Sequence, residues 1–133
     1  MSDMPSRVEL CPLTHANQDE FCSLVRASAE LHSPWMKLPA TAAEFQGWMH
    51  RFNGGLNRGY VIRVKETGAA AGTVNINSII RGRYQGASLG YAAFAPSAGR
   101  GYMTEGLTAT LRHAFEDLRL HRLEANIQPA NEA

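Results

Sequence analysis

The 133-residue sequence predicts one α/β (α+β) domain, in which a mixed, mainly antiparallel sheet is flanked by helices. Apolar residues recur with a period of two in short segments and with a helical period in longer ones. Short turns join three successive strand segments, which favours antiparallel hairpins. A helical segment separates the last two strand segments, which favours a parallel pair with a crossover. The predicted order is β-α-α-β-β-β-α-β.

The composition is that of an ordinary globular protein and excludes several classes. With 44% hydrophobic and 19% charged residues and a net charge of +1, nothing points to disorder or to a nucleic-acid or membrane partner. Neither a signal peptide nor a transmembrane segment is visible, so we expect a cytoplasmic protein. Cys11 and Cys22 lack CxxC spacing and are expected to be buried thiols. The five histidines show no metal-ligand spacing and most are expected at the surface, so no metal site is predicted.

The first part of the chain contains one strand and two helices. "RVELCPLT" (7–14) alternates loosely and predicts a strand, and Thr14 is a candidate N-cap for the first helix. That helix has apolar or small residues at helical spacing, namely Phe21, Leu24, Val25, Ser28 and Leu31. "SPWMKLP" (33–39) breaks it with two prolines. Thr41 and Glu44 form a capping box for the second helix, whose apolar stripe is Phe45, Trp48, Met49 and Phe52.

Three strands and a further helix follow. The strands are predicted over residues 59–66, 73–80 and 87–95, with Val74, Ile76 and Ile80 on one face of the second. The helix begins near Gly101, with an apolar stripe of Met103, Leu107, Leu111, Ala114, Phe115 and Leu118. "RLEANI" (122–127) predicts the fifth strand.

The stretch "APSAGRGYMTEGL" (95–107) joins the fourth strand to this helix and contains Gly99, Arg100 and Gly101. A helix N-terminus presents unpaired N–H groups and partial positive charge, and glycines let an anion come close. The stretch matches neither G-x-x-x-x-G-K-[S/T] nor G-x-G-x-x-G in a first βαβ unit. The glycines alone therefore leave two readings open, a structural turn and a phosphate site.

Residues 89–133, "LGYAAFAPSAGRGYMTEGLTATLRHAFEDLRLHRLEANIQPANEA", resemble the acetyl-CoA core of the GNAT superfamily of N-acetyltransferases. The family pattern is Gln or Arg, two residues, Gly, one residue, then Gly or Ala. It falls on residues 98–103, with Gly101 as the central glycine. "GRGYMTEGL" and "HRLEANIQPANEA" are most similar to the RimJ/RimL branch, which acetylates the N-terminal residue of ribosomal proteins. The resemblance implies an acyltransferase that moves an acetyl group from acetyl-CoA to a primary amine.

The resemblance also implies which residues hold the cofactor. Backbone N–H groups of the glycine loop would bind the CoA pyrophosphate, and the strand before the loop would pair with the pantetheine arm. An asparagine after the last strand would contact the cofactor as well. The implied cofactor-binding residues are Ala93, Phe94, Gly99, Arg100, Gly101, Tyr102, Met103, Thr104 and Asn131.

Three features depart from the family. Ala98 stands where Gln or Arg is preferred, and Pro96 precedes it one residue sooner than usual. Family members continue beyond the fifth strand with a helix and two strands, whereas this chain stops at Ala133. We therefore expect residues 1–133 to form a single acyl-CoA N-acyltransferase domain that is C-terminally incomplete. Its exposed sheet edge would favour a homodimer.

Direct attack of an amine on a thioester needs orientation, a base and donors for the developing oxyanion. Glu124, on the fifth strand, is the candidate base, and a solvent-facing carboxylate is its alternative. Main-chain N–H groups near Phe94 are candidate oxyanion donors, and Glu105 is expected to serve the helix dipole. Candidates for the acceptor side are Trp35 and Tyr91, with Asn75, Asn77 and Ser88. Each of these has an alternative as an ordinary core or sheet residue.

The expected acceptor is the N-terminal amine of a protein such as a ribosomal protein. A polyamine acceptor would need an acidic cleft, and no acidic cluster surrounds the first two helices. The alternatives are acetylation of a small-molecule amine and a non-catalytic CoA-binding module.

Overall fold

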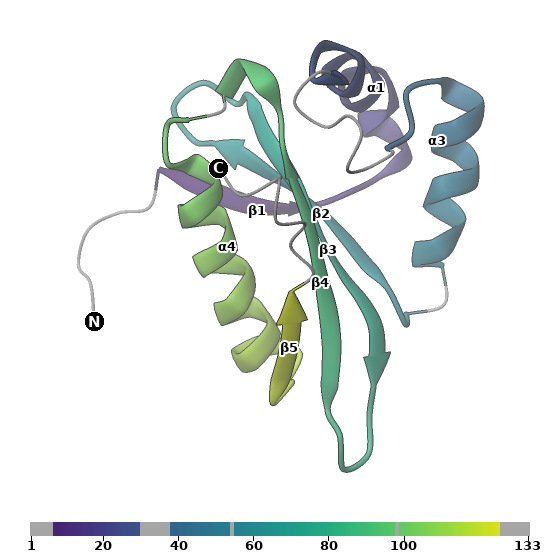
Figure 1. Cartoon of the computed structure of the whole chain (residues 1–133), viewed down its shortest axis with the longest axis vertical. Coiled ribbons are helices and arrows are strands. Elements are labelled where there is room, and N and C mark those ends of the chain that lie inside the picture. The colour runs from purple at the N-terminus through teal and green to yellow at the C-terminus, as the bar shows by residue number, and fades with distance from the viewer. Residues whose placement is uncertain (1–6, 30–37, 54, 98, 126–133) are drawn as a thin grey trace.

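A five-stranded sheet with helices on both faces forms the fold (Figure 1). A computed structural model describes residues 7–29, 38–53, 55–97 and 99–125. The strands are β1 (Val8–Pro12), β2 (Arg58–Val64), β3 (Ala70–Ile80), β4 (Gly86–Ala93) and β5 (Arg122–Ala125). The helices are α1 (Gln18–Ala27), α3 (Ala42–Met49) and α4 (Tyr102–Arg112), and a π-helical turn, His113–Asp117, continues α4. The predicted order and fold class are confirmed.

The strands lie in the order β1-β2-β3-β4-β5. The first three pairings are antiparallel, and β4 pairs with β5 in parallel, as predicted from the helix between them. The parallel register joins Gly86–Leu89 to Arg122–Ala125. Within the described ranges β5 pairs with β4 alone, so it forms one edge of the sheet.

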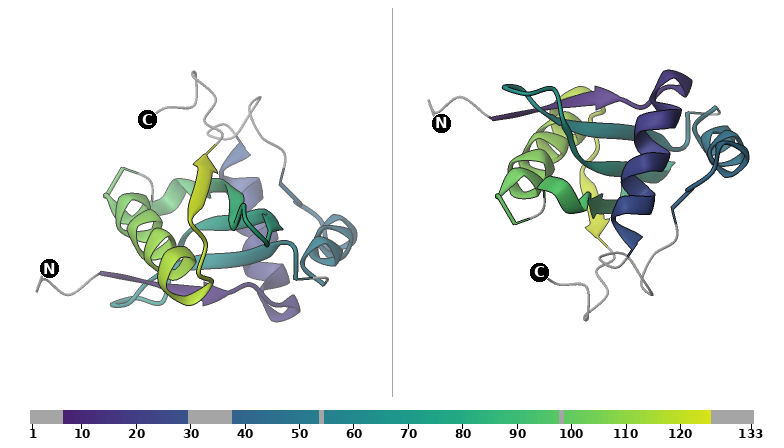
Figure 2. Two further views of the ribbon diagram at one scale, coloured as in Figure 1. Left: turned by 90° about the horizontal axis from the view of Figure 1, so that it is seen from below. Right: turned by 90° about the horizontal axis from the view of Figure 1, so that it is seen from above.

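Two apolar clusters hold the helices on opposite faces of the sheet (Figures 1 and 2). On one face, α1 and α3 pack over a cluster that includes Phe21, Phe45 and Phe94. The Phe21 ring meets the Phe94 ring edge-on at 5.6 Å, a favoured aromatic geometry. On the other face, α4 covers a cluster that includes Ile62 and Val74.

Side-chain hydrogen bonds fix the ends of α1 and α3. Thr41 Oγ1 accepts a hydrogen bond from the Glu44 N–H at 3.2 Å, which confirms the predicted cap of α3. The Glu44 carboxylate accepts from the Ala40 N–H at 2.9 Å, one residue before the cap. At the end of α1, the fully buried Ser28 hydroxyl accepts from the Ala95 N–H at 2.8 Å. This bond ties α1 to the segment that leaves β4.

A bulge in β3 makes the predicted burial of Ile80 wrong. Ser78 has a φ of 54°, and the β3–β4 register shifts in this part of the strand. Because the extra residue reverses the alternation, Ile79 is buried, whereas Ile80 is 53% exposed.

α4 approaches the sheet through small residues, so its predicted apolar stripe is only partly right. Leu111 and Phe115 are 40% and 43% exposed. The face turned to the sheet centres on Gly106 and Thr110, and Thr110 Oγ1 donates to Gly106 O at 2.8 Å. A Cβ on Gly106 would lie 2.8 Å from Ile62 Cγ1, so this glycine sets how closely α4 can pack. Stripe members that are buried or half-buried are Met103, Leu107, Ala114 and Leu118.

Both cysteines are free thiols, as predicted. Cys22 is buried as predicted, whereas Cys11 is only half-buried, so its predicted burial is wrong. Burial raises the pKa of both thiols, so few thiolates are present at neutral pH. None of the described helices is long and apolar enough to cross a membrane.

Candidate functional site

The glycine loop between β4 and α4 has the backbone of an anion site. Gly99 and Gly101 have φ of +80° and +78°, a region that favours glycine. Gly101 is the N-cap of α4, so no side chain caps the helix. Among the described residues, none accepts a hydrogen bond from the N–H groups of Tyr102, Met103 or Thr104. These groups remain available to a ligand.

The loop is also open to an approaching anion. Gly99, Arg100, Gly101 and Thr104 are exposed, and a Cβ on Gly99 would meet nothing within 4 Å. The N-terminus of the 11-residue helix adds partial positive charge. All six residues predicted for the pyrophosphate loop lie together here, and the arrangement fits a phosphate group.

Along β4, the main-chain N–H and C=O groups of successive residues point alternately toward its two neighbouring strands, β3 and β5. The Phe94 N–H donates to Ala71 O at 2.9 Å, so this N–H is engaged with β3 and is not the predicted oxyanion donor. By the alternation of an antiparallel ladder, the main-chain groups of Tyr91 and Ala93 point toward the side of β5. Within the described residues, the β4–β5 pairing extends only to Leu89. The main-chain groups of Ala93 therefore face the β5 side of β4, whereas the Phe94 N–H faces β3.

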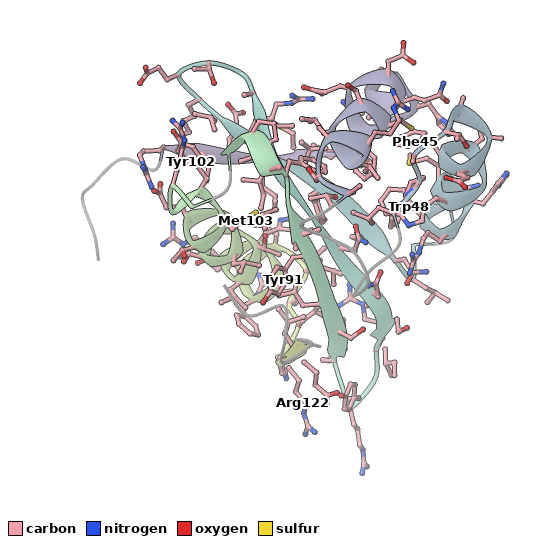
Figure 3. The ribbon with its side chains drawn as sticks, turned by 45° about the horizontal axis from the view of Figure 1, so that its top comes forward. Phe45, Trp48, Tyr91, Tyr102, Met103 and Arg122 are labelled. Carbon is pink, nitrogen blue, oxygen red and sulfur yellow. The ribbon has the colours of Figure 1, made fainter. Side chains whose placement is uncertain are left out.

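Gly72 of β3 allows the first turn of α4 to lie against the sheet. A Cβ at Gly72 would overlap Met103 Sδ and would lie 2.6 Å from Ala92 O. Met103 is a further departure from the family pattern, because it occupies the last position, where Gly or Ala is usual. Figure 3 shows Met103 between α4 and the sheet, on the same side as Tyr91.

Polar side chains gather on the opposite sheet face, which carries α1 and α3. The register places Asn77 opposite Ser88, and Ser88 opposite Glu124, so the three form one row across β3, β4 and β5. Asn75 lies on the same face, opposite Gly90. The Oδ1 atoms of Asn75 and Asn77 are buried and accept no hydrogen bond from the described part of the chain. Buried acceptors without donors are rare, and a ligand that donates N–H groups would satisfy them.

Several predicted site residues do not join this row. Tyr91 is half-buried and packs on the α4 side of the sheet, away from the asparagines. Trp35, Ala98 and Asn131 lie outside the described residues. An open cavity of about 280 Å³ lies beside α3 and is lined by Leu38, Pro39, Ala43, Glu44, Gly47 and Trp48.

Three side chains form a hydrogen-bonded series that the sequence did not predict. Asp117 Oδ2 lies 2.8 Å from His113 Nδ1, and His113 Nε2 lies 2.7 Å from the Tyr60 hydroxyl, on β2. Burial raises the pKa of Tyr60, so the hydroxyl keeps its proton. His113 is half-buried. The i, i+4 spacing of His113 and Asp117 was visible in the sequence, but Tyr60 lies 53 residues away.

The described residues contain no group of three or more His, Cys, Asp or Glu that could hold a metal ion. The candidate site thus has three parts. They are the glycine loop, the edge of β4 beside it, and the polar face of the sheet on the side of α1 and α3.

Comparisons with known proteins identify the family of this chain. Residues 7–133 match the family described as acetyltransferase (GNAT) domain. The Bacillus subtilis (strain 168) protein named Probable N-acetyltransferase YjcK is 43% identical over 60 residues, which cover 45% of this chain and 33% of that protein. The ribosomal protein uS5-alanine N-acetyltransferase of Escherichia coli (strain K12) is 35% identical over 60 residues, 45% of this chain and 31% of that protein.

A solved structure assigned as a ribosomal-protein-serine acetyltransferase from Vibrio cholerae superposes with a TM-score of 0.78 at 29% identity. The superposition covers 96% of this chain and 74% of that chain. The matched stretch spans about a third of the length of the two curated relatives. The match to the family over residues 7–133 and the agreement in fold lead to one conclusion: this chain belongs to the GNAT acetyltransferase family.

Proposed function

We propose that this chain binds acetyl-CoA at the glycine loop and transfers the acetyl group to a primary amine. One observation carries the proposal: two left-handed glycines precede α4, and three first-turn N–H groups have no acceptor among the described residues. GNAT acetyltransferases use acetyl-CoA, and its pyrophosphate is an anion of the kind that such a terminus binds.

The thioester supplies an activated acetyl group. The amine nitrogen bonds to the carbonyl carbon, the C–S bond breaks, the nitrogen loses a proton, and CoA leaves as its thiol. The chain contributes orientation and a proton acceptor. Glu124 is the proposed base, because it is an exposed carboxylate in one row with Ser88 and Asn77.

The proposed acceptor is the N-terminal amine of a protein. Two similar proteins are named as acetyltransferases of a ribosomal-protein alanine or serine. The buried oxygens of Asn75 and Asn77 suit N–H donors, which a peptide main chain supplies. The cavity beside α3 gives the same side of the molecule an apolar recess.

Calorimetric titration with acetyl-CoA tests the cofactor. A thiol-release assay with a panel of peptides and a panel of small amines then tests the transfer. Background from the protein should be low, because burial raises the pKa of Cys11 and Cys22. Transfer to amines alone would favour a small-molecule enzyme. Binding without transfer to either panel would favour a non-catalytic CoA-binding module.

Replacement of Asn75 or Asn77 by Val should separate stability from acceptor use. A buried acceptor without a donor costs about 1–3 kcal/mol, so each variant should unfold at the same or a higher temperature. Acetyl transfer to the preferred acceptor should fall several-fold, while the Kd for acetyl-CoA stays unchanged. Thermal unfolding, calorimetry and the thiol-release assay measure the three quantities.

Asn57 provides the matched control. Its side chain accepts from the Ser78 N–H at 2.9 Å and donates to Arg51 O at 2.9 Å, so Asn57→Val should destabilise the protein. If Asn75→Val and Asn77→Val lower the unfolding temperature as much as Asn57→Val does, both oxygens are satisfied in the free protein. The proposed acceptor contact would then be wrong.

A further inference from the structure

Arg7, just before β1, carries its guanidinium to the glycine loop. Its Nη2 donates to Arg100 O at 3.0 Å. Its Cζ lies 4.7 Å from the centroid of the Tyr102 ring, a cation–π contact. A Cβ on Gly101 would lie 3.1 Å from the same Nη2. One side chain therefore contacts or borders three consecutive residues, from the loop into α4.

Glu105, in the first turn of α4, holds this guanidinium in place. Its Oε1 accepts from the Arg7 backbone N–H at 2.8 Å, and its Oε2 accepts from Arg7 Nε and pairs with Nη2. Arg7 O accepts from the Lys65 N–H at 2.9 Å, so the Arg7 backbone extends the β1–β2 ladder. Hydrogen bonding to Glu105 raises the pKa of Arg7, which stays charged. Glu105 was predicted to interact with the helix dipole. In the structure it also holds the Arg7 side chain in place.

We propose that Arg7 is a positioning residue for the glycine loop, the proposed cofactor-binding loop. It fixes the Arg100 carbonyl, and with it the left-handed Gly101, before the ligand arrives. A loop that is ordered in advance loses less conformational entropy on binding. This inference rests on the proposed function of the loop. Arg7 acts through the loop rather than on a phosphate, since the Glu105 carboxylate already matches its charge.

A second ion pair of similar construction offers a matched control. Arg63, on β2, pairs with Glu20, in the first turn of α1, through contacts of 2.7 Å and 2.9 Å. This pair also joins a strand to a helix, but it lies outside the cofactor loop. Arg63→Gln should therefore remove a comparable ion pair without touching the loop.

The first experiment compares acetyl-CoA binding by Arg7→Gln, Arg7→Lys and Arg63→Gln. Arg7→Gln should raise the Kd about five- to tenfold and the KM in parallel, while kcat at saturating acetyl-CoA stays unchanged. Arg7→Lys keeps the charge but lacks the planar fork that reaches Glu105 and Arg100 together, so it should restore only part of the affinity. Arg63→Gln should leave the Kd unchanged. Equal losses of affinity in Arg7→Gln and Arg63→Gln would overturn the proposal.

Glu105→Gln distinguishes positioning from direct phosphate contact. If Arg7 acts through the loop, Glu105→Gln should also weaken binding, and the double variant should lose less than the two single losses combined. If Arg7 contacts the phosphate, freeing it from Glu105 should leave affinity equal or higher. That result would contradict the positioning role.

A second readout does not depend on cofactor binding. Trypsin cleaves after Arg100, and the carbonyl of that peptide bond is the one that Arg7 holds. Cleavage at this bond under native conditions should be several-fold faster in Arg7→Gln than in the parent protein or Arg63→Gln, because the loop opens more often. Unchanged cleavage would refute the role of Arg7. A parent protein that binds no acetyl-CoA would refute only the proposed function.

Discussion

Gly101→Ala is expected to weaken acetyl-CoA binding at least tenfold. Gly101 has a φ of +78°, and a non-glycine residue held in such a conformation costs about 1–3 kcal/mol. A new Cβ would also lie 3.1 Å from Arg7 Nη2 and would press against the residue that contacts the loop. The chain would relieve both by turning the loop away from the geometry that aims its N–H groups at a phosphate. Calorimetric titration measures the change in Kd.

Gly68→Ala is the matched control for this loop. Gly68 has a φ of +77° in the turn between β2 and β3, and a Cβ there would meet nothing within 4 Å. It should therefore lose similar stability through backbone strain while keeping the parent affinity for acetyl-CoA. If Gly101→Ala binds as the parent does, the loop is only a structural turn and the proposed cofactor site is wrong.

Gly106→Ala is expected to lower the free energy of unfolding by about 1–3 kcal/mol, as overpacking of a filled core does. The sign of this change in stability is informative. Helix propensity alone would make the Ala variant more stable by about 1 kcal/mol, so a loss of stability has to come from packing. A Cβ on Gly106 would overlap Ile62 Cδ1 and would lie 2.8 Å from Ile62 Cγ1. α4 must then move off the sheet or Ile62 must leave its rotamer. Chemical denaturation measures the change.

Gly47→Ala in α3 is the matched control, because it is the same substitution in a helix where no neighbouring side chain blocks the new Cβ. No atom lies within 4 Å of a Cβ at Gly47, so this variant should be more stable than the parent by about 0.4–1 kcal/mol. Increased stability in both variants would mean that α4 does not pack against β2 as closely as described. The spacing of α4 from the sheet would then need another explanation.

Local signals were sufficient for the element order, and tertiary contacts decided the rest. The Thr41 cap and the parallel β4–β5 pair follow from neighbouring residues and from the helix between the strands. The bulge at Ser78 has no such signal, and it exchanged Ile80 for Ile79 in the core. In α4, counting large apolar residues favours Leu111 and Phe115, but the contact face is set by how closely small residues allow the helix to approach.

In the candidate site, too, some features could be predicted from the local sequence and others depend on tertiary contacts. The glycine loop could be located from the sequence, since Gly99 and Gly101 adopt the conformations that favour glycine. The engagement of the Phe94 N–H could not, because it depends on the ladder register with Ala71. The pairing of Met103 with Gly72 and the contact of Arg7 with Glu105 join residues far apart in the chain. Spacing along the sequence carries no information about such pairs.

The contact between Arg7 and Glu105 also bears on the order of events during synthesis. The two residues are 98 positions apart, and contacts of such separation form only after a long loop has closed. During synthesis Arg7 leaves the ribosome 98 residues before Glu105, so the contact that supports the loop cannot form until Glu105 has emerged. If the loop binds acetyl-CoA as proposed, binding is a late property of the nascent chain and requires a sheet whose first four strands have already formed.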